Sequence, residues 1–319
     1  MYHEPIFLEP VLKERIWGGT KLKETFGYSL PSDQTGECWG ISAHPNGDCT
    51  IKNGPLRGQT LRTAWKEHGG LFGEEEGEEF PLLVKLLDAA DDLSVQVHPD
   101  DQKAKLLEKE EAFGKTECWY VVQADPGASL ILGHHAQTKE ELEKKMNEGK
   151  WTELLRTVPV QAGDFFYVPS GTIHAIGGGA LILETQQSSD TTYRVYDYDR
   201  TGADGEKREL HLDKSLEAAS VPHIDPNSSR EVLQQDDHGT IEQLVRSPFF
   251  QVYRIHCRTR LVPGLDAPYV LASVLQGEGT VETEDTTVSV EKGAHFIIPA
   301  TTGPWEINGD VELIVSTRR

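Results

Sequence analysis

The chain lacks the features of a membrane-spanning, secreted or disulfide-linked protein. It has no apolar run of about 18 residues, so we expect no transmembrane helix. Residues 1–5 hold no basic region followed by an apolar stretch, so we expect no secretory signal. No C-x-x-C pair occurs among the four cysteines, which is typical of reduced thiols in a cytoplasmic protein: Cys38, Cys49, Cys118 and Cys257.

Positive charge is scarce. The chain holds 31 Lys and Arg against 52 Asp and Glu, which gives a formal net charge of −21. A field of this sign repels nucleic acid and anionic membrane surfaces, so we expect neither as a partner. A phosphorylated small molecule would need a local cluster of Lys and Arg. The length of 319 residues allows one large domain or two of ordinary size.

Long helical patterns are also few, and short apolar runs broken by Gly, Pro and Asp dominate instead. Many short strands separated by turn signals predict a mainly β protein, a sandwich or a barrel. The predicted strands include residues 81–87, 93–97, 118–122, 129–132, 164–168, 180–184 and 249–255. Helices are expected at 102–112, at 138–155 with Thr138 as N-cap and Glu141 completing a capping box, and at 213–219.

Two segments resemble each other and indicate an internal repeat. In residues 163–169 and 293–299, a Gly and a Pro lie six positions apart, with an aromatic residue at the fourth position. His174 follows Gly163 by eleven residues, whereas the matching position of the second copy is Pro304. The second copy therefore keeps the turn but lacks the histidine. The breaker-rich segment 221–229 is interpreted as a linker.

A Q-x-H pattern ends one of the apolar runs. Because strand side chains alternate, Gln96 and His98 are expected to point to one face. Glu117 opens the next strand-like run, and His174 lies further along the chain. Two imidazoles, a carboxylate and an amide oxygen can surround a divalent metal and leave one position open for catalysis. The alternative is that these histidines are structural.

Three segments carry a resemblance to a known family. Residues 94–100, 115–117 and 163–174 resemble the type I mannose-6-phosphate isomerases of the cupin superfamily, and the similarity runs from Glu9 to about Arg200. It implies two cupin-like jelly-roll units with a few short helices. Residues 1–228 would form the metal-binding catalytic unit, with a short helical insertion at about 138–155 where larger members carry a long one. Residues 229–319 would form a cupin-like unit without metal ligands.

The resemblance also implies roles for individual residues. It implies one Zn²⁺ per chain, other divalent metals being possible, held by Gln96, His98, Glu117 and His174. The segment 184–194 resembles the active-site lining of the family. It makes Glu184 a candidate base, Asp190 a polar orienting residue and Arg194 a cation facing the substrate. Lys115 is expected to share a strand face with Glu117, so the base remains open between Lys115 and Glu184.

Further residues are expected to contact the substrate. The resemblance places Lys85 and Ser94 near the sugar phosphate. Glu37 and Trp39 match another family segment and are expected to form or support the pocket wall. Arg200 is a candidate for phosphate binding, although the sequence after Arg194 differs from the larger members of the family.

The resulting hypothesis is a cytoplasmic, metal-dependent isomerase that interconverts mannose 6-phosphate and fructose 6-phosphate by proton transfer through an enediol. Two alternatives stay open. One is a cupin-type non-haem iron oxygenase that uses His98, Glu117 and His174. The other is a non-catalytic sugar-binding cupin, since a fold does not fix a function. The sequence makes no prediction of the oligomeric state.

Overall fold

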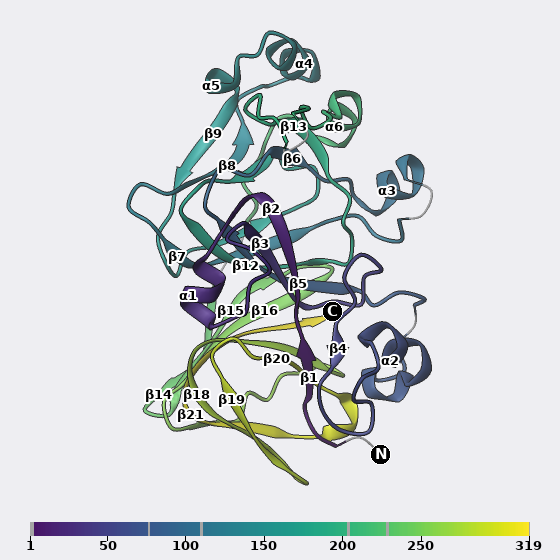
Figure 1. Cartoon of the computed structure of the whole chain (residues 1–319), viewed down its shortest axis with the longest axis vertical. Coiled ribbons are helices and arrows are strands. Elements are labelled where there is room, and N and C mark those ends of the chain that lie inside the picture. Colours follow the sequence, from purple (N-terminus) through teal and green to yellow (C-terminus); the bar gives the residue numbers. More distant parts are fainter. Residues whose placement is uncertain (1–2, 76, 109–110, 203–204, 228–229, 319) are drawn as a thin grey trace.

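The protein is mainly β, as predicted, with its strands in three antiparallel sheets (Figure 1). The computed structural model describes residues 3–75, 77–108, 111–202, 205–227 and 230–318. Within these ranges, every helix is too short or too polar to cross a membrane.

Two of the sheets face each other and form a sandwich. The six-stranded sheet has the order β10 (Phe165–Val168), β7 (Glu117–Ala124), β12 (Ala180–Gln187), β5 (Leu82–Ala89), β3 (Thr35–Ile41) and β2 (Val11–Gly19). The five-stranded sheet has the order β13 (Tyr193–Tyr196), β6 (Val95–Val97), β11 (His174–Ile176), β8 (Ser129–His134) and β9 (Leu155–Pro159). Apolar side chains from both sheets pack between them, including Trp119, Ile182, Leu130 and Ile176.

The third sheet is built mainly from the C-terminal part of the chain. Its order is β14 (Glu231–Asp236), β15 (Gly239–Arg246), β16 (Phe250–Cys257), β21 (Trp305–Arg318), β18 (Val270–Thr283), β20 (His295–Ile298), β1 (Ile6–Glu9) and β4 (Thr50–Ile51). In addition, β17 (Arg260–Leu261) pairs with β21, and β19 (Thr287–Glu291) pairs with β18. The strands β1 and β4 thus join N-terminal residues to the C-terminal sheet. The predicted boundary between residues 228 and 229 lies outside the described residues.

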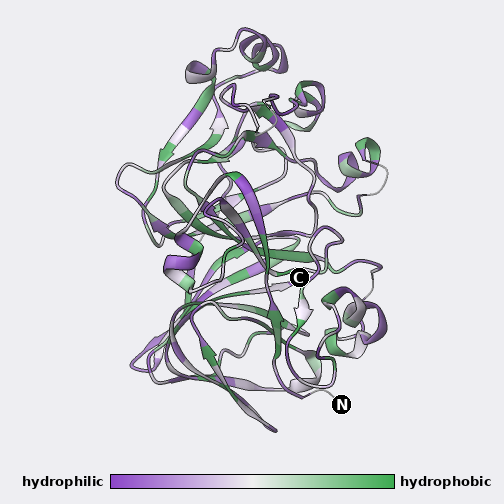
Figure 2. Ribbon diagram, viewed as in Figure 1, coloured by the Kyte–Doolittle hydropathy of each residue, from purple (hydrophilic) through white to green (hydrophobic). Residues whose placement is uncertain are grey.

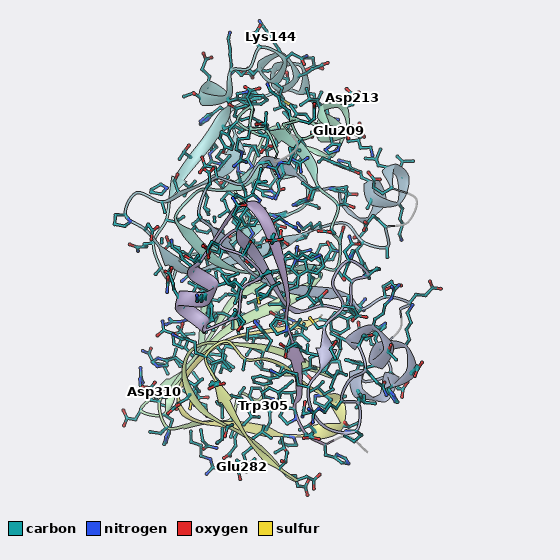
Figure 3. The ribbon with its side chains drawn as sticks, in the orientation of Figure 1. Lys144, Glu209, Asp213, Glu282, Trp305 and Asp310 are labelled. Atoms are coloured by element: carbon teal, nitrogen blue, oxygen red, sulfur yellow. The ribbon has the colours of Figure 1, made fainter. Side chains whose placement is uncertain are left out.

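The central strands of the six-stranded sheet, β12, β5 and β3, are buried on both faces. The second face of this sheet packs against the ten-stranded sheet, where Val84 and Leu86 share an apolar cluster with Val252 and Leu271. Figure 2 shows hydrophobic colouring along these central strands. Charged side chains such as Lys144 and Glu282 lie at the periphery (Figure 3). Burial on both faces gives the strands that carry the site a rigid support.

The helices are short and lie outside the sheets. They are α1 (Lys21–Phe26), α2 (Leu61–Glu67), α3 (Asp101–Leu107), α4 (Lys139–Asn147), α5 (Trp151–Leu154) and α6 (Leu212–Ala218), with 3-10 turns η1 (Gly69–Phe72) and η2 (Ala300–Thr302). The three predicted helical segments overlap α3, α4 with α5, and α6, and α3 already ends at Leu107. The sequence patterns did not predict α1 and α2, which span only six and seven residues.

The predicted helix 138–155 is in fact two helices followed by a strand. Its start is as predicted, because the Thr138 hydroxyl accepts a hydrogen bond from the Glu141 amide at 3.2 Å. Between α4 and α5, Gly149 adopts φ +66°, a left-handed conformation that favours glycine and ends the first helix. The chain then enters β9 at Leu155.

Packing against these helices determines which side chains of β6 face the apolar core. Val95 and Val97 pack in a core with residues of α4, α5 and α6, namely Leu142, Met146, Leu154 and Ala218. Since side chains alternate along a strand, Gln96 and His98 point the other way, into the space between the two facing sheets.

Candidate active site

Three predicted metal ligands meet between the facing sheets. His98 follows β6, Glu117 begins β7 and His174 begins β11, and all three are buried. One ligand atom from each lies within 4.8 Å of the others. His98 Nε2 is 3.5 Å from one Glu117 oxygen, and His174 Nε2 is 3.2 Å from the other. Residues 76 positions apart in the chain are thus brought to one point by strand pairing.

The chemistry of this cluster fits a divalent cation. Both carboxylate oxygens of Glu117 are buried without a hydrogen-bond partner among the described residues. His174 Nδ1 lies 2.9 Å from the Thr172 carbonyl, so it donates there and leaves the Nε2 lone pair facing Glu117. Burial lowers the pKa of His174 to about 4 and that of His98 well below its usual range, so both rings are neutral at pH 7. Neutral imidazole lone pairs and a buried carboxylate are donors that suit a divalent metal ion.

The fourth predicted ligand lies beside this cluster. Gln96 pairs with His174 in the sheet register, and its side-chain nitrogen is 3.3 Å from His174 Nε2. Turning the amide by 180° puts the oxygen at this point, and the two orientations are equivalent in shape. The structure therefore brings Gln96, His98, Glu117 and His174 together.

A cavity of about 360 Å³ opens beside the cluster. This volume is in the range of small-molecule sites. Most of the predicted site residues line it: Glu37, Lys85, Ser94, Gln96, Lys115, Glu184, Asp190 and Arg194. Four polar or aromatic lining residues were not predicted: Arg15, Trp17, Thr192 and Arg208. No spacing rule connects these four to the ligands, because they lie on β2 and in segments flanking β13.

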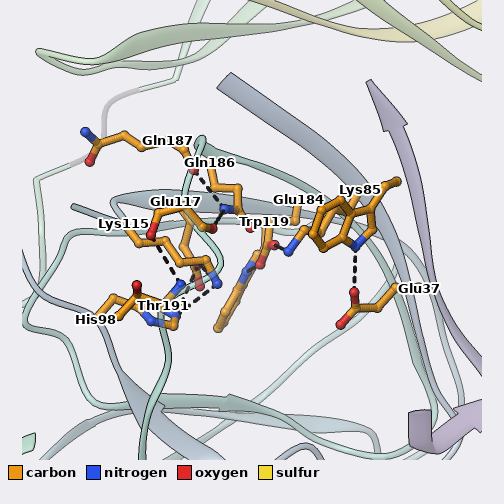
Figure 4. Close-up of polar contacts among 12 residues, drawn as sticks. Glu37, Lys85, His98, Lys115, Glu117, Trp119, Glu184, Gln186, Gln187 and Thr191 are labelled. Atoms are coloured by element: carbon orange, nitrogen blue, oxygen red, sulfur yellow. Dashed lines mark hydrogen bonds and ion pairs between the residues drawn. The ribbon is translucent and has the colours of Figure 1, made fainter. Parts of the chain in front are cut away.

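Lys115 lies against the metal-ligand cluster (Figure 4). Its Nζ is 3.2 Å from His98 Nε2 and 3.4 Å from a Glu117 oxygen. Burial lowers the pKa of this amine, but the nearby carboxylates, Glu117 and Glu184 foremost, outweigh it and hold the pKa above its usual value. Lys115 is therefore a positive charge at neutral pH.

Glu184 lies on β12, the strand next to β7, and is buried. Its carboxylate accepts a hydrogen bond from Trp119 Nε1 at 2.9 Å and is 3.8 Å from Lys85 Nζ. Burial, followed by the negative charge of Glu117, raises the pKa of Glu184 above its usual value. A buried carboxylate with a raised pKa is suited to proton transfer near neutral pH.

Glu37 and Trp39 support the part of the cavity wall that contains Lys85. Trp39 Nε1 donates to Glu37 at 2.6 Å, and Arg15 donates to both Glu37 oxygens at 2.9 and 3.1 Å. The Lys85 ammonium lies 4.6 Å from the Trp39 ring centroid. Trp39 is fully buried behind the cavity surface, whereas Glu37 lines it. Trp39 thus holds Lys85 and Glu37 in place.

The remaining predicted residues differ in position. Arg194 donates to Ser94 Oγ at 3.3 Å, and both line the cavity. Asp190 also lines it and accepts from Asn46 at 2.9 Å. Arg200 lies outside the lining, where it donates to Asp197 at 2.6 Å.

The second copy of the internal repeat keeps its turn. Gly163 and Gly293 adopt φ +88° and +89°, and β10 and β20 follow them. Its buried His295 is engaged by Ser273 at 2.8 Å and by Tyr28 at 3.0 Å. In the described part of the chain, the one group of three or more His, Cys, Asp or Glu able to hold a metal is that of His98, Glu117 and His174.

Comparison with known proteins agrees with these features. Residues 6–120 match the family described as phosphomannose isomerase type I, catalytic domain. Residues 240–318 match the cupin domain of mannose-6-phosphate isomerase. The similarity thus continues beyond Arg200, further than the motifs alone indicated.

Relatives in Bacillus subtilis match nearly the whole chain. A probable mannose-6-phosphate isomerase, GmuF, is 51% identical over 312 residues, 98% of each chain. The mannose-6-phosphate isomerase ManA of this species is 49% identical and covers 99% of each chain. A crystal structure of the mannose 6-phosphate isomerase from Bacillus subtilis superposes with a TM-score of 0.95 at 49% identity, over 98% of this chain and 99% of that one. On this evidence, the chain belongs to the type I mannose-6-phosphate isomerase family.

Proposed function

We propose that this protein interconverts mannose 6-phosphate and fructose 6-phosphate. The observation that carries the proposal is a cavity lined by the buried carboxylate Glu184 and several cations, beside a buried His–Glu–His cluster that the lining residue Lys115 contacts. The names and near full-length identity of the Bacillus relatives support the choice of substrate. The wall of Lys and Arg suits an anionic sugar better than dioxygen, which favours the isomerase over the iron oxygenase.

We propose that Gln96, His98, Glu117 and His174 hold one divalent ion, with Zn²⁺ as first choice. The ion would polarise or orient the sugar oxygens near C1 and C2. Two observations support this assignment: the Glu117 oxygens accept no hydrogen bond from the described residues, and the Thr172 carbonyl fixes the tautomer of His174.

Isomerisation moves a proton between C2 and C1 through an enediol, and this step needs a base beside the substrate. Glu184 is the first choice, because its raised pKa keeps it able to accept and return a proton near pH 7. The charged Lys115 would stabilise negative charge on the sugar oxygens, and it remains the second candidate for the base. Lys85 would hold the Glu184 carboxylate in place.

For the substrate's other groups, we assign Arg194 and Ser94 to the phosphate end and Asp190 to a sugar hydroxyl. The contact between Arg194 and Ser94 supports this. Glu37 and Trp39 support the wall. The role predicted for Arg200 in phosphate binding would require its release from Asp197.

We further propose that residues 1–228 form the catalytic unit and 229–319 a metal-free unit that supports it. Contacts between the units run behind the site: Thr185, next to Glu184, hydrogen-bonds Ser316 at 2.9 Å. A cytoplasmic location is supported by the four free, buried thiols.

An isomerase assay on mannose 6-phosphate, combined with elemental analysis before and after chelation, tests the proposal. We expect about one divalent ion per chain and activity that falls with metal content and returns when the ion is restored. Full activity in protein freed of metal would contradict the metal assignment, and absence of activity with metal bound would contradict the function.

Isomerisation in heavy water tests the proton-transfer route. We expect solvent deuterium on the carbon that receives the proton, because a carboxylate or amine that holds the proton can exchange it with water. NMR or mass spectrometry of the product measures the incorporation. Complete retention of the substrate's own label at every stage of conversion would favour a hydride shift instead.

Replacing Arg194 by Ala should lower kcat/KM for mannose 6-phosphate at least tenfold, about 1.4 kcal/mol in transition-state stabilisation. The physical reason is the loss of a half-buried cation in a chain of net charge −21. Steady-state kinetics measure the change, with Arg246→Ala as an exposed control. Unchanged kinetics in Arg194→Ala would move the phosphate role to other cations.

A further inference from the structure

Most cations that line the cavity already have a carboxylate partner. Arg15 is engaged by Glu37 through two hydrogen bonds, and Lys85 lies 3.8 Å from Glu184. Lys115 lies against the metal-ligand cluster. Of the other two lining cations, Arg194 has no carboxylate partner among the described residues, and Arg208 pairs with Asp197 through Nε and Nη2 only.

These two arginines lie side by side. The chain after β13 turns back, so that the His211 amide donates to the Arg194 carbonyl at 2.8 Å. Arg194 Nη1 in turn donates to the Glu209 carbonyl at 2.8 Å. Burial and then the charge of Arg208 lower the pKa of Arg194, as expected for neighbouring guanidinium groups. No ion pair within the described residues engages Arg194.

Asp197 fixes the direction of Arg208. This buried carboxylate accepts from Arg208 Nε at 2.7 Å and also from Nη2, which leaves Nη1 without a hydrogen bond among the described residues. Arg200 shares Asp197 and also pairs with the exposed Asp91 at 3.5 Å. Two guanidinium groups therefore share one buried carboxylate, and Arg194 lines the cavity with Arg208 without an ion pair among the described residues, so this part of the lining carries excess positive charge. A phosphate monoester, with a charge of about −1.5 to −2 at pH 7, complements this excess.

The distance between Ser94 and the proposed ligand Gln96 suits the size of the proposed substrate. Ser94, which contacts Arg194, directly precedes β6 and lies two residues before the proposed ligand Gln96, and both side chains line the cavity. Two residues of strand span about 7 Å, which is on the scale of a hexose ring. An anion at Ser94 and Arg194 would thus lie one sugar away from the proposed metal site.

We propose that Arg208, oriented by Asp197, binds the substrate phosphate together with Arg194 and selects phosphorylated over unphosphorylated sugars. This inference rests on the proposed function. It gives Arg208 the role that the sequence patterns suggested for Arg200.

Kinetics of Arg208→Met test it, with Arg246→Met as a control that removes the same charge from the exposed end of β15. We expect KM for mannose 6-phosphate to rise about tenfold or more, with kcat changed less than about threefold. The inhibition constant of inorganic phosphate should rise by the same factor, while kcat/KM for unphosphorylated mannose stays unchanged. Arg208→Lys should recover part of the loss, since it keeps the charge without the bidentate contact to Asp197.

Unchanged KM and phosphate affinity in Arg208→Met would overturn the inference. So would an equal loss on mannose, which would indicate a structural role, or a larger effect of Arg200→Met. If Arg208→Met does not fold, the same comparison is decided by Arg208→Lys.

Calorimetry with inorganic phosphate separates this inference from the proposed function. Phosphate binding that is lost in the variant, in a protein without isomerase activity, would overturn the function and support the role of Arg208.

Discussion

The His174→Ala protein is expected to lose its metal and its isomerase activity together while it keeps its fold. His174 presents Nε2 to Glu117. Its replacement by Ala removes one of the two imidazoles of the proposed metal site, which leaves His98, Glu117 and Gln96 as ligands. The His174 ring packs edge-on against Trp119, but the apolar clusters of both units are otherwise left intact, so the sheets should persist. Elemental analysis, the isomerase assay and circular dichroism measure the three properties on one sample.

His135→Ala is the matched control. His135 is an exposed histidine that directly follows β8. Its replacement should leave metal content and activity intact. A His174→Ala protein with full metal occupancy would contradict the ligand assignment.

Replacing Glu184 by Gln should reduce kcat by about two to four orders of magnitude, the usual contribution of a general base, while the metal stays bound. The amide keeps the shape of the side chain and its contact with Trp119, but it cannot accept the proton from carbon. Lys115→Met should cost less if the lysine acts through its charge. Steady-state kinetics with metal analysis compare the two variants. A larger loss of kcat in Lys115→Met than in Glu184→Gln would assign the base to the lysine.

The Trp119→Phe variant sharpens this test. The hydrogen bond from Trp119 lowers the pKa of Glu184, so its removal should raise that pKa. A base works only when deprotonated, which means that the acidic limb of the kcat profile should move to higher pH. An unmoved limb would indicate that Glu184 is not the titrating base.

The sequence by itself determined the features that depend on neighbouring residues. The alternation of Val95, Gln96, Val97 and His98 predicted which side chains share a face, because the strand period is local and the apolar face must be buried. The capping residue Thr138 predicted the start of α4, because a cap is a contact between residues three positions apart in the sequence. The glycine turns before β10 and β20 were also visible as a repeat.

Only the tertiary structure decided which distant residues share the cavity. Arg15 reaches it because β2 pairs with β3, and Arg208 because the chain folds back along β13. Arg200 lies only six residues after Arg194 in the sequence, but Asp197 holds its side chain outside the cavity lining. The pairing of β1 with β20, across nearly the whole chain, was equally invisible. Such placements follow from strand pairing and ion pairs between segments far apart in the sequence. The periodicity of side chains along one strand or helix carries no information about them.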